Sequence, residues 1–181
     1  MRKLVIVVSG PPGAGSSTIA KKLAEKLNLR YYSPGKTYKS YLNEKEAKAA
    51  LDFWQTSFGS SKELHRRLDE DQVKVAREGN VVICGKLSIY FLKDIADFKV
   101  WLDVPLEMRA KRTAERDKIP KTVALEEIKK RQELEREKWK KIYGFDYFEL
   151  KNYADLVIDS SNLTVEETVD RILKSLKTKI L

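Results

Sequence analysis

The chain has 181 residues, of which 42% are hydrophobic and 35% charged, and its formal net charge is +9. These values predict one globular domain with a substantial core, and no apolar run approaches the length of about 18 residues that a membrane span requires. The single cysteine, Cys84, excludes an internal disulfide, and we expect a cytoplasmic protein. Residues 1–3 lead directly into a predicted strand, so we expect no cleaved signal peptide.

The excess of positive charge is concentrated in residues 105–141, which hold thirteen Lys and Arg and eight Asp and Glu. Such a charge attracts either nucleic acid or a small polyanion such as a nucleotide. The basic residues are not interleaved with aromatic residues, and the sequence has no RNA-binding signature. We therefore expect a small polyanionic ligand rather than a nucleic acid or a membrane.

A glycine-rich turn follows the first predicted strand, which comprises residues 5–8. The residues after the turn predict a helix with Ile19, Leu23 and Leu27 on one stripe. A strand, a tight turn and a helix N-terminus together direct backbone N–H groups and the positive end of the helix dipole at one point, which favours phosphate. We expect phosphate binding here, and the alternative is a purely structural strand-to-helix turn.

Gly10 and Gly15 have the spacing of the P-loop pattern G-x-x-x-x-G-K-[ST], and Ser17 occupies the hydroxyl position that holds Mg²⁺. The pattern requires lysine at the position of Ser16. Loss of one preorganised donor lowers a rate by about 10²–10³. Either another cation reaches the bound phosphates, or this site binds and acts on them weakly.

The rest of the chain alternates between strands and helices. Continuously apolar strands in such an alternation predict an α/β protein with a parallel sheet that is covered on both faces. The predicted strands comprise residues 5–8, 29–33, 80–85, 98–103 and 156–159. The predicted helices after the first comprise residues 36–39, 43–58, 60–78 with Ser60 as N-cap and Glu63 as its partner, and a closing helix from about 163.

Ligands bind at the carboxyl ends of the strands in a parallel sheet. Three turns of this chain lie at such ends: residues 9–17, residues 33–39 after the second strand, and Lys86 after the third. The sequence therefore predicts that these turns converge on one crevice.

A long helical insertion, residues 105–153, separates the last two strands. Arg109, Arg112 and Arg116 recur at spacings of three and four and share one helix face. Residues 126–141 hold twelve charges and only three apolar side chains, so this part has little to bury. The insertion is either a solvated, salt-bridged surface or a mobile lid that carries arginines over phosphates.

Other candidate residues favour structural roles. His65, the only histidine, lies on a charged helix and is expected at the surface, since no second ligand stands near it for a metal site. Cys84 is expected as a small buried hydrophobic residue. Asp159 ends the last strand, where it either faces the nucleotide or begins the next helix. The tryptophans are expected in core or lid packing: Trp54, Trp101 and Trp139.

The P-loop, the turn at 33–35, the arginine-bearing insertion and residues 154–161 (ADLVIDSS) together resemble the nucleoside monophosphate kinases. The match is greatest to the short archaeal-type cytidylate (CMP) kinases, which residues 72–82 (QVKVAREGNVV) and 142–146 (IYGFD) also resemble. The resemblance covers almost the whole chain and is weakest over residues 40–65. It implies a P-loop NTPase fold, a three-layer sandwich with a five-stranded parallel sheet in the order 2-3-1-4-5 and a helical lid.

The resemblance also implies a division of the single kinase domain, residues 1–181. The parts are a core of residues 1–36, 79–104 and 154–181, monophosphate-binding helices at 37–78, and a lid at 105–153.

The activity that the resemblance implies is transfer of the ATP γ-phosphoryl group to CMP or dCMP with Mg²⁺, slowed by the absence of the P-loop lysine. Lys39 and Lys86 stand where the family usually has arginine, and Cys84 where it has an acidic residue. The implied ATP-binding residues are Gly10, Pro11, Pro12, Gly13, Ala14, Gly15, Ser16, Ser17 and Thr18, with Ser17 on Mg²⁺. The implied acceptor-binding residues are Ser33, Gly35, Lys39 and Lys86, and the implied catalytic cations are Lys86, Arg109, Arg112 and Arg116.

Lys86 and Lys36 are the best substitutes for the missing lysine, because both are expected at the crevice, and we take Lys86 as the hypothesis. Two other functions remain open: a P-loop kinase for another small molecule, and a nucleotide-binding protein without catalysis. The expected ligands are ATP and CMP or dCMP, and the expected assembly is a monomer or homodimer.

Overall fold

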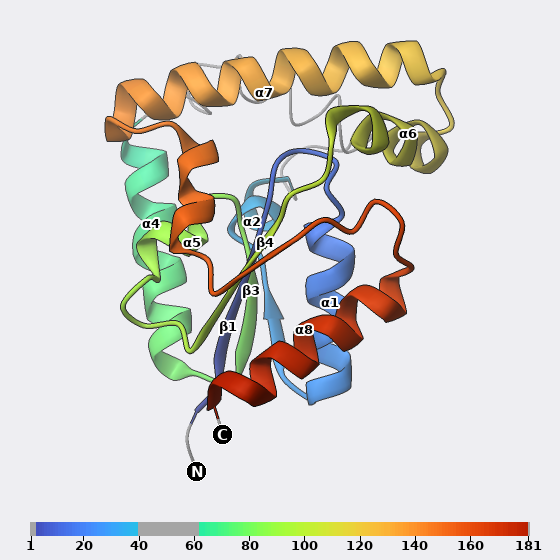
Figure 1. Ribbon diagram of the computed structural model, residues 1–181. Coiled ribbons are helices and arrows are strands. Elements are labelled where there is room, and N and C mark those ends of the chain that lie inside the picture. The colour runs from blue at the N-terminus through green and yellow to red at the C-terminus, as the bar shows by residue number, and fades with distance from the viewer. Residues whose placement is uncertain (1–2, 40–61, 181) are drawn as a thin grey trace.

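The computed structural model describes residues 3–39 and 62–180 (Figure 1). Five strands form one parallel sheet in the order β2-β3-β1-β4-β5. This is the sheet that the sequence predicts and the strand order that the resemblance implies. The strands are β1 (Val5–Ser9), β2 (Arg30–Tyr32), β3 (Val81–Cys84), β4 (Phe98–Leu102) and β5 (Leu156–Ile158).

Helices follow the strands as expected. None of the helices in the described part is both long and apolar enough to cross a membrane. The helix predicted at 43–58 and the N-cap predicted at Ser60 lie outside the described residues. The helices are α1 (Ser16–Leu27), α2 (Pro34–Lys39), α4 (Lys62–Glu78), α5 (Ser88–Phe91), α6 (Leu106–Asp117), α7 (Lys121–Tyr143), a 3₁₀ helix η1 (Tyr147–Tyr153) and α8 (Val165–Ile180).

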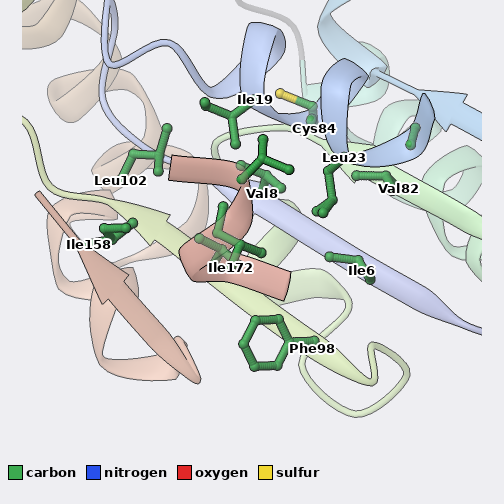
Figure 2. Close-up of a cluster of buried hydrophobic side chains, with 14 of the residues drawn as sticks. Ile6, Val8, Ile19, Leu23, Val82, Cys84, Phe98, Leu102, Ile158 and Ile172 are labelled. Atoms are coloured by element: carbon green, nitrogen blue, oxygen red, sulfur yellow. The ribbon is translucent and has the colours of Figure 1, made fainter. Parts of the chain in front are cut away.

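The sheet separates two hydrophobic clusters because successive side chains of a strand point to opposite faces. In β1, Ile6 and Val8 pack on the face that α1 and α8 cover, whereas Val5 and Val7 pack on the face of α4 and α5. Figure 2 shows the first cluster, in which Ile172 of α8 lies among strand residues. Every residue of β1 is therefore buried, which explains its continuous apolar run.

A reciprocal cap begins α8. The Thr164 hydroxyl oxygen accepts a hydrogen bond from the Glu167 backbone N–H at 3.1 Å, and Glu167 Oε2 accepts one from the Thr164 backbone N–H at 2.8 Å. This is a capping box, which satisfies donors that have no partner inside the helix.

Replacement of Thr164 by alanine is expected to lower the free energy of unfolding by about 1 kcal/mol, because the cap loses its acceptor. The measurement is urea unfolding of Thr164→Ala beside Thr178→Ala. The Thr178 hydroxyl only donates to the Lys174 carbonyl within the same helix, so its loss is expected to have a smaller effect. Equal effects of the two substitutions would contradict the capping role.

The insertion folds as α6 and α7, and α7 crosses the top of the molecule in Figure 1. We expected residues 126–141 to have little to bury, and only three side chains of this range are buried, of which Glu135 is the one that the sequence did not indicate. Ile128, Glu135 and Trp139 are buried, and the Trp139 ring meets Tyr147 of η1 edge to face with ring centroids 4.9 Å apart. Few apolar residues suffice because they stand on one side of the helix and meet a preformed surface.

Candidate active site

A cavity of about 840 Å³ lies where the turns after β1, β2 and β3 meet the inner sides of α6 and α7. Its lining includes residues 11–18, residues 33–36 and residues 84–88. These are the three turns that the sequence predicts at the carboxyl ends of neighbouring strands, so the expected crevice exists. The lining residues from α6 and α7 are Arg112, Thr113, Arg116, Arg131 and Trp139.

The first turn has the backbone that an anion site needs. Gly13 and Gly15 have φ angles of 79° and 90°, which disfavour any residue with a side chain. Gly15 caps α1 without a side-chain hydrogen bond, so the first N–H groups of α1 are left to a ligand. Gly10 has a different role: a Cβ there would stand 2.9 Å from the Leu102 carbonyl oxygen, so glycine is required for packing against β4.

Ser16 and Ser17 both line the cavity. The Ser17 hydroxyl lies 3.7 Å from Cys84 Sγ, and burial raises the pKa of that thiol, which stays neutral. Cys84 is 4% exposed, as expected. The oxygen of Ser17 is of the type that Mg²⁺ prefers, and its place at the start of α1 fits a metal ion held between protein and phosphate.

Lys86 lies beside a buried carboxylate from α7. Glu135 is fully buried, and its Oε1 accepts hydrogen bonds from Lys86 Nζ at 3.0 Å and Arg131 Nε at 2.9 Å. Burial alone raises the pKa of Glu135, but the two cations outweigh it and hold that pKa below its usual value. Because two cations share one carboxylate, Lys86, Arg131 and Glu135 together carry a net positive charge at the cavity wall.

Arg112 and Arg116 line the cavity from α6. The Arg112 guanidinium donates to the Ala14 carbonyl at 3.1 Å and to the Ser160 carbonyl at 2.5 Å, so it joins the first turn to the segment after β5. Arg116 is exposed and pairs with Asp117 at 2.7 Å. Both guanidinium groups therefore border the space above the first turn.

Arg109 differs from the other two arginines of α6. It is 4% exposed and donates three hydrogen bonds of 2.9 Å, to the carbonyls of Val104 and Pro12 and to Gln132 Oε1. It is not among the residues that line the cavity. This placement matches a residue that holds the first turn and α7 together, in contrast to the clamp expected for it.

The acceptor side of the cavity includes Ser33, Gly35 and Lys36, and Lys39 ends α2. Lys36 Nζ stands 5.7 Å from the centroid of the Tyr31 ring. Lys36 and Lys86, the two candidates for the missing cation, therefore both border the cavity.

Sequence reasoning missed one wall of the cavity, which α4 forms. Our expectation that His65 lies at the surface is wrong: it is 3% exposed, because Tyr143 of α7 packs against it with ring centroids 6.1 Å apart. Leu68, Asp69 and Gln72 line the same wall. These residues lie three and four apart on the face of α4 that also buries Ala76, but the sequence did not indicate that the polar residues of this face line the cavity.

Asp69 is the most perturbed carboxyl of this wall. Burial raises its pKa to about 7, although hydrogen bonds from the Tyr143 hydroxyl and the Gln72 amide oppose the rise. The folded protein therefore binds a proton between about pH 4 and 7 that the unfolded chain, with the ordinary Asp value, releases.

The free energy of unfolding is accordingly expected to fall as the pH rises from 5 to 8. Allowing for partial solvent access, Asp69 contributes about 1–2 kcal/mol of this fall. In Asp69→Asn this contribution is expected to disappear, whereas Asp71→Asn, at an exposed position of α4, is expected to retain it. The measurement is urea unfolding at the two pH values, and an unchanged slope in Asp69→Asn would refute the assignment.

The remaining candidates have structural positions. Asp159 is exposed and accepts a hydrogen bond from the Ser161 backbone N–H at 2.8 Å, so it shapes the turn before α8. Trp101 is fully buried and Trp139 is 4% exposed, as expected for packing residues. Trp54 lies outside the described residues.

The strand order, the glycine turn that feeds α1 and the arginines of α6 beside it define a P-loop kinase fold. Solved structures agree: a shikimate kinase from Bacteroides thetaiotaomicron is 19% identical with a TM-score of 0.65, and the match covers 97% of this chain and 99% of that chain. A shikimate kinase from Acinetobacter baumannii is 15% identical with a TM-score of 0.66 over 99% and 96% of the two chains.

The chain belongs to the cytidylate kinase-like family, whose model matches residues 5–162. A cytidylate kinase from Ignicoccus hospitalis is 40% identical over 172 residues, which cover 95% of this chain and 98% of that protein. A cytidylate kinase from Sulfurisphaera tokodaii is 37% identical over 173 residues, which cover 95% and 94%. The resemblance stated from the motifs is therefore confirmed at the level of the family.

Proposed function

We propose that the chain transfers the γ-phosphoryl group of ATP to CMP or dCMP, giving ADP and CDP or dCDP. The observation that carries the proposal is a cavity, lined by described residues, that contacts both the P-loop turn and the turn after β2 in a member of this family. One cavity of this kind brings donor and acceptor together, which phosphoryl transfer requires. The similarity to proteins named cytidylate kinase supports CMP as the acceptor.

Phosphoryl transfer needs alignment and neutralisation of charge more than a nucleophilic side chain. In the proposal, the turn of residues 10–18 holds the ATP phosphates through backbone N–H groups. Ser17 would hold Mg²⁺, which neutralises phosphate charge when bound. Arg112 and Arg116 approach the transferring group from the lid, residues 105–153, and Ser33, Gly35 and Lys39 hold the acceptor phosphate. Arg109 acts as a positioning residue that fixes the Pro12 carbonyl.

Lys86 supplies the positive charge that the P-loop pattern has at position 16, where this chain has Ser16. It lines the cavity, and its Nζ shares Glu135 with Arg131. Lys86, Arg131 and Glu135 together carry a net positive charge, which favours the β- and γ-phosphates at this wall of the cavity. We also propose a cytoplasmic location and a monomer or homodimer.

The test is a coupled assay of ADP release with CMP, dCMP, UMP and AMP as acceptors. We expect turnover with CMP and dCMP near or below ~1 s⁻¹, at the low end for kinases, because Ser16 supplies no ammonium group. Release that favours AMP or UMP would contradict the acceptor assignment. No release with any acceptor, together with ATP binding in calorimetry, would establish a nucleotide-binding protein without catalysis.

A further inference from the structure

The α4 wall of the cavity adjoins the acceptor side. Helix α2, whose first residues line the cavity, contacts α4, and both helices contribute to the same space. Leu68 of α4 and Trp139 of α7 border it with apolar side chains, as a flat heterocyclic ring requires. If the acceptor phosphate lies at the turn of residues 33–35, its base has this wall within reach.

Gln72 is an unsatisfied polar residue in this wall. Its side chain is 2% exposed and lines the cavity. Its Nε2 donates to Asp69 Oδ1 at 3.2 Å, whereas its Oε1 is buried and receives no hydrogen bond from the described residues. Buried acceptors normally receive a hydrogen bond, and this oxygen receives none from the described residues. A ligand in the cavity is able to supply the missing donor.

Asp69 determines which way the Gln72 amide points. An ionised carboxylate only accepts hydrogen bonds, and its two oxygens take one each from the Gln72 amide and the Tyr143 hydroxyl, the latter at 2.7 Å. Above the pKa of Asp69, which is about 7, the NH₂ group of Gln72 must therefore face Asp69, and its oxygen must face the other way. These hydrogen bonds therefore fix the orientation of the Gln72 amide, with Oε1 as the atom that has no donor.

We propose that Gln72 Oε1 accepts a hydrogen bond from the 4-amino group of the cytosine base and so selects CMP over UMP. Uracil has a carbonyl oxygen in place of this amine, and two acceptors that face each other in a buried site repel. The inference rests on the proposed function, and it adds a residue that reads the base to the residues that hold phosphate.

The experiment measures KM and kcat for CMP, UMP and 2-pyrimidinone riboside monophosphate, which is CMP without its amino group. Assays are run with saturating ATP. The pH is 8, because Asp69, whose pKa is about 7, is then ionised. In the wild type we expect KM for CMP to be at least about tenfold lower than for the other two acceptors. Gln72→Leu is expected to raise KM for CMP by a similar factor, to lower KM for UMP because the two facing acceptors are no longer both present, and to leave KM for the amine-free analogue unchanged.

Val73→Ala controls for damage to α4, since Val73 is the next residue and does not line this cavity. The wild-type comparison of CMP with its amine-free analogue does not depend on the folding of any variant. An equal loss for all three acceptors in Gln72→Leu, or an unchanged ratio of CMP to UMP, would overturn the inference and leave the kinase function standing. A wild type that neither binds nor phosphorylates CMP in calorimetry and assay would overturn the proposed function, and the inference with it.

Discussion

Replacement of Lys86 by alanine is expected to lower kcat for CMP phosphorylation by about 10²–10³, the effect of removing one preorganised electrostatic group. The reason is that Lys86 borders the cavity and carries the charge that Ser16 does not. Steady-state kinetics and calorimetric titration with ATP and magnesium measure the change. Unchanged turnover together with unchanged ATP affinity would eliminate Lys86 as the substitute cation.

The ion pair of Lys86 requires a control, because in this variant buried Glu135 keeps Arg131 as its remaining ionic partner among the described residues. Breaking a buried pair lowers stability by about 3–5 kcal/mol. Combining Lys86→Ala with Glu135→Gln is expected to restore much of the stability without restoring turnover. Lys36→Ala tests the other candidate cation, and we expect it to lower kcat less than Lys86→Ala does.

Replacement of Arg109 by alanine is expected to lower the free energy of unfolding by about 3 kcal/mol, because a buried guanidinium with three hydrogen bonds disappears. The Pro12 carbonyl loses its donor, so ATP affinity is also expected to fall. Urea unfolding and calorimetric ATP titration measure the two effects.

Arg116→Ala is the matched control from the same helix. Arg116 is exposed, and surface ion pairs such as its pair with Asp117 contribute about 0–1 kcal/mol. We expect its loss to leave the stability nearly unchanged and to lower kcat about tenfold or more. A loss of turnover without loss of stability in Arg109→Ala would show instead that Arg109 acts on the phosphates.

The sheet and the first turn were predictable because their signals are local. A continuous apolar run predicts β1, a glycine-rich turn follows it, and an amphipathic pattern predicts α1. These signals depend very little on the rest of the chain. The convergence of three turns followed from a topological rule for parallel sheets. The identity of the family followed from motifs spread over the chain.

The partners of charged residues were not predictable. Arg109, Arg112 and Arg116 share the spacing that predicts one face, yet Arg109 meets the carbonyl of Pro12, 97 residues away. Glu135 is one of many charges in α7, and its complete burial depends on Lys86, 49 residues away. Periodicity identifies the residues of a helix that share a face, whereas only tertiary packing decides what that face contacts.

The backbone of the first turn is expected to bind a triphosphate although lysine is absent at position 16. The most direct measurement is a titration of the ¹⁵N-labelled protein with ATP and magnesium, followed through the amide resonances of residues 13–18. We predict that these resonances shift and saturate with ATP, because the ligand accepts hydrogen bonds from their N–H groups. Amide resonances that stay unmoved at millimolar ATP would show that the first turn does not bind the nucleotide.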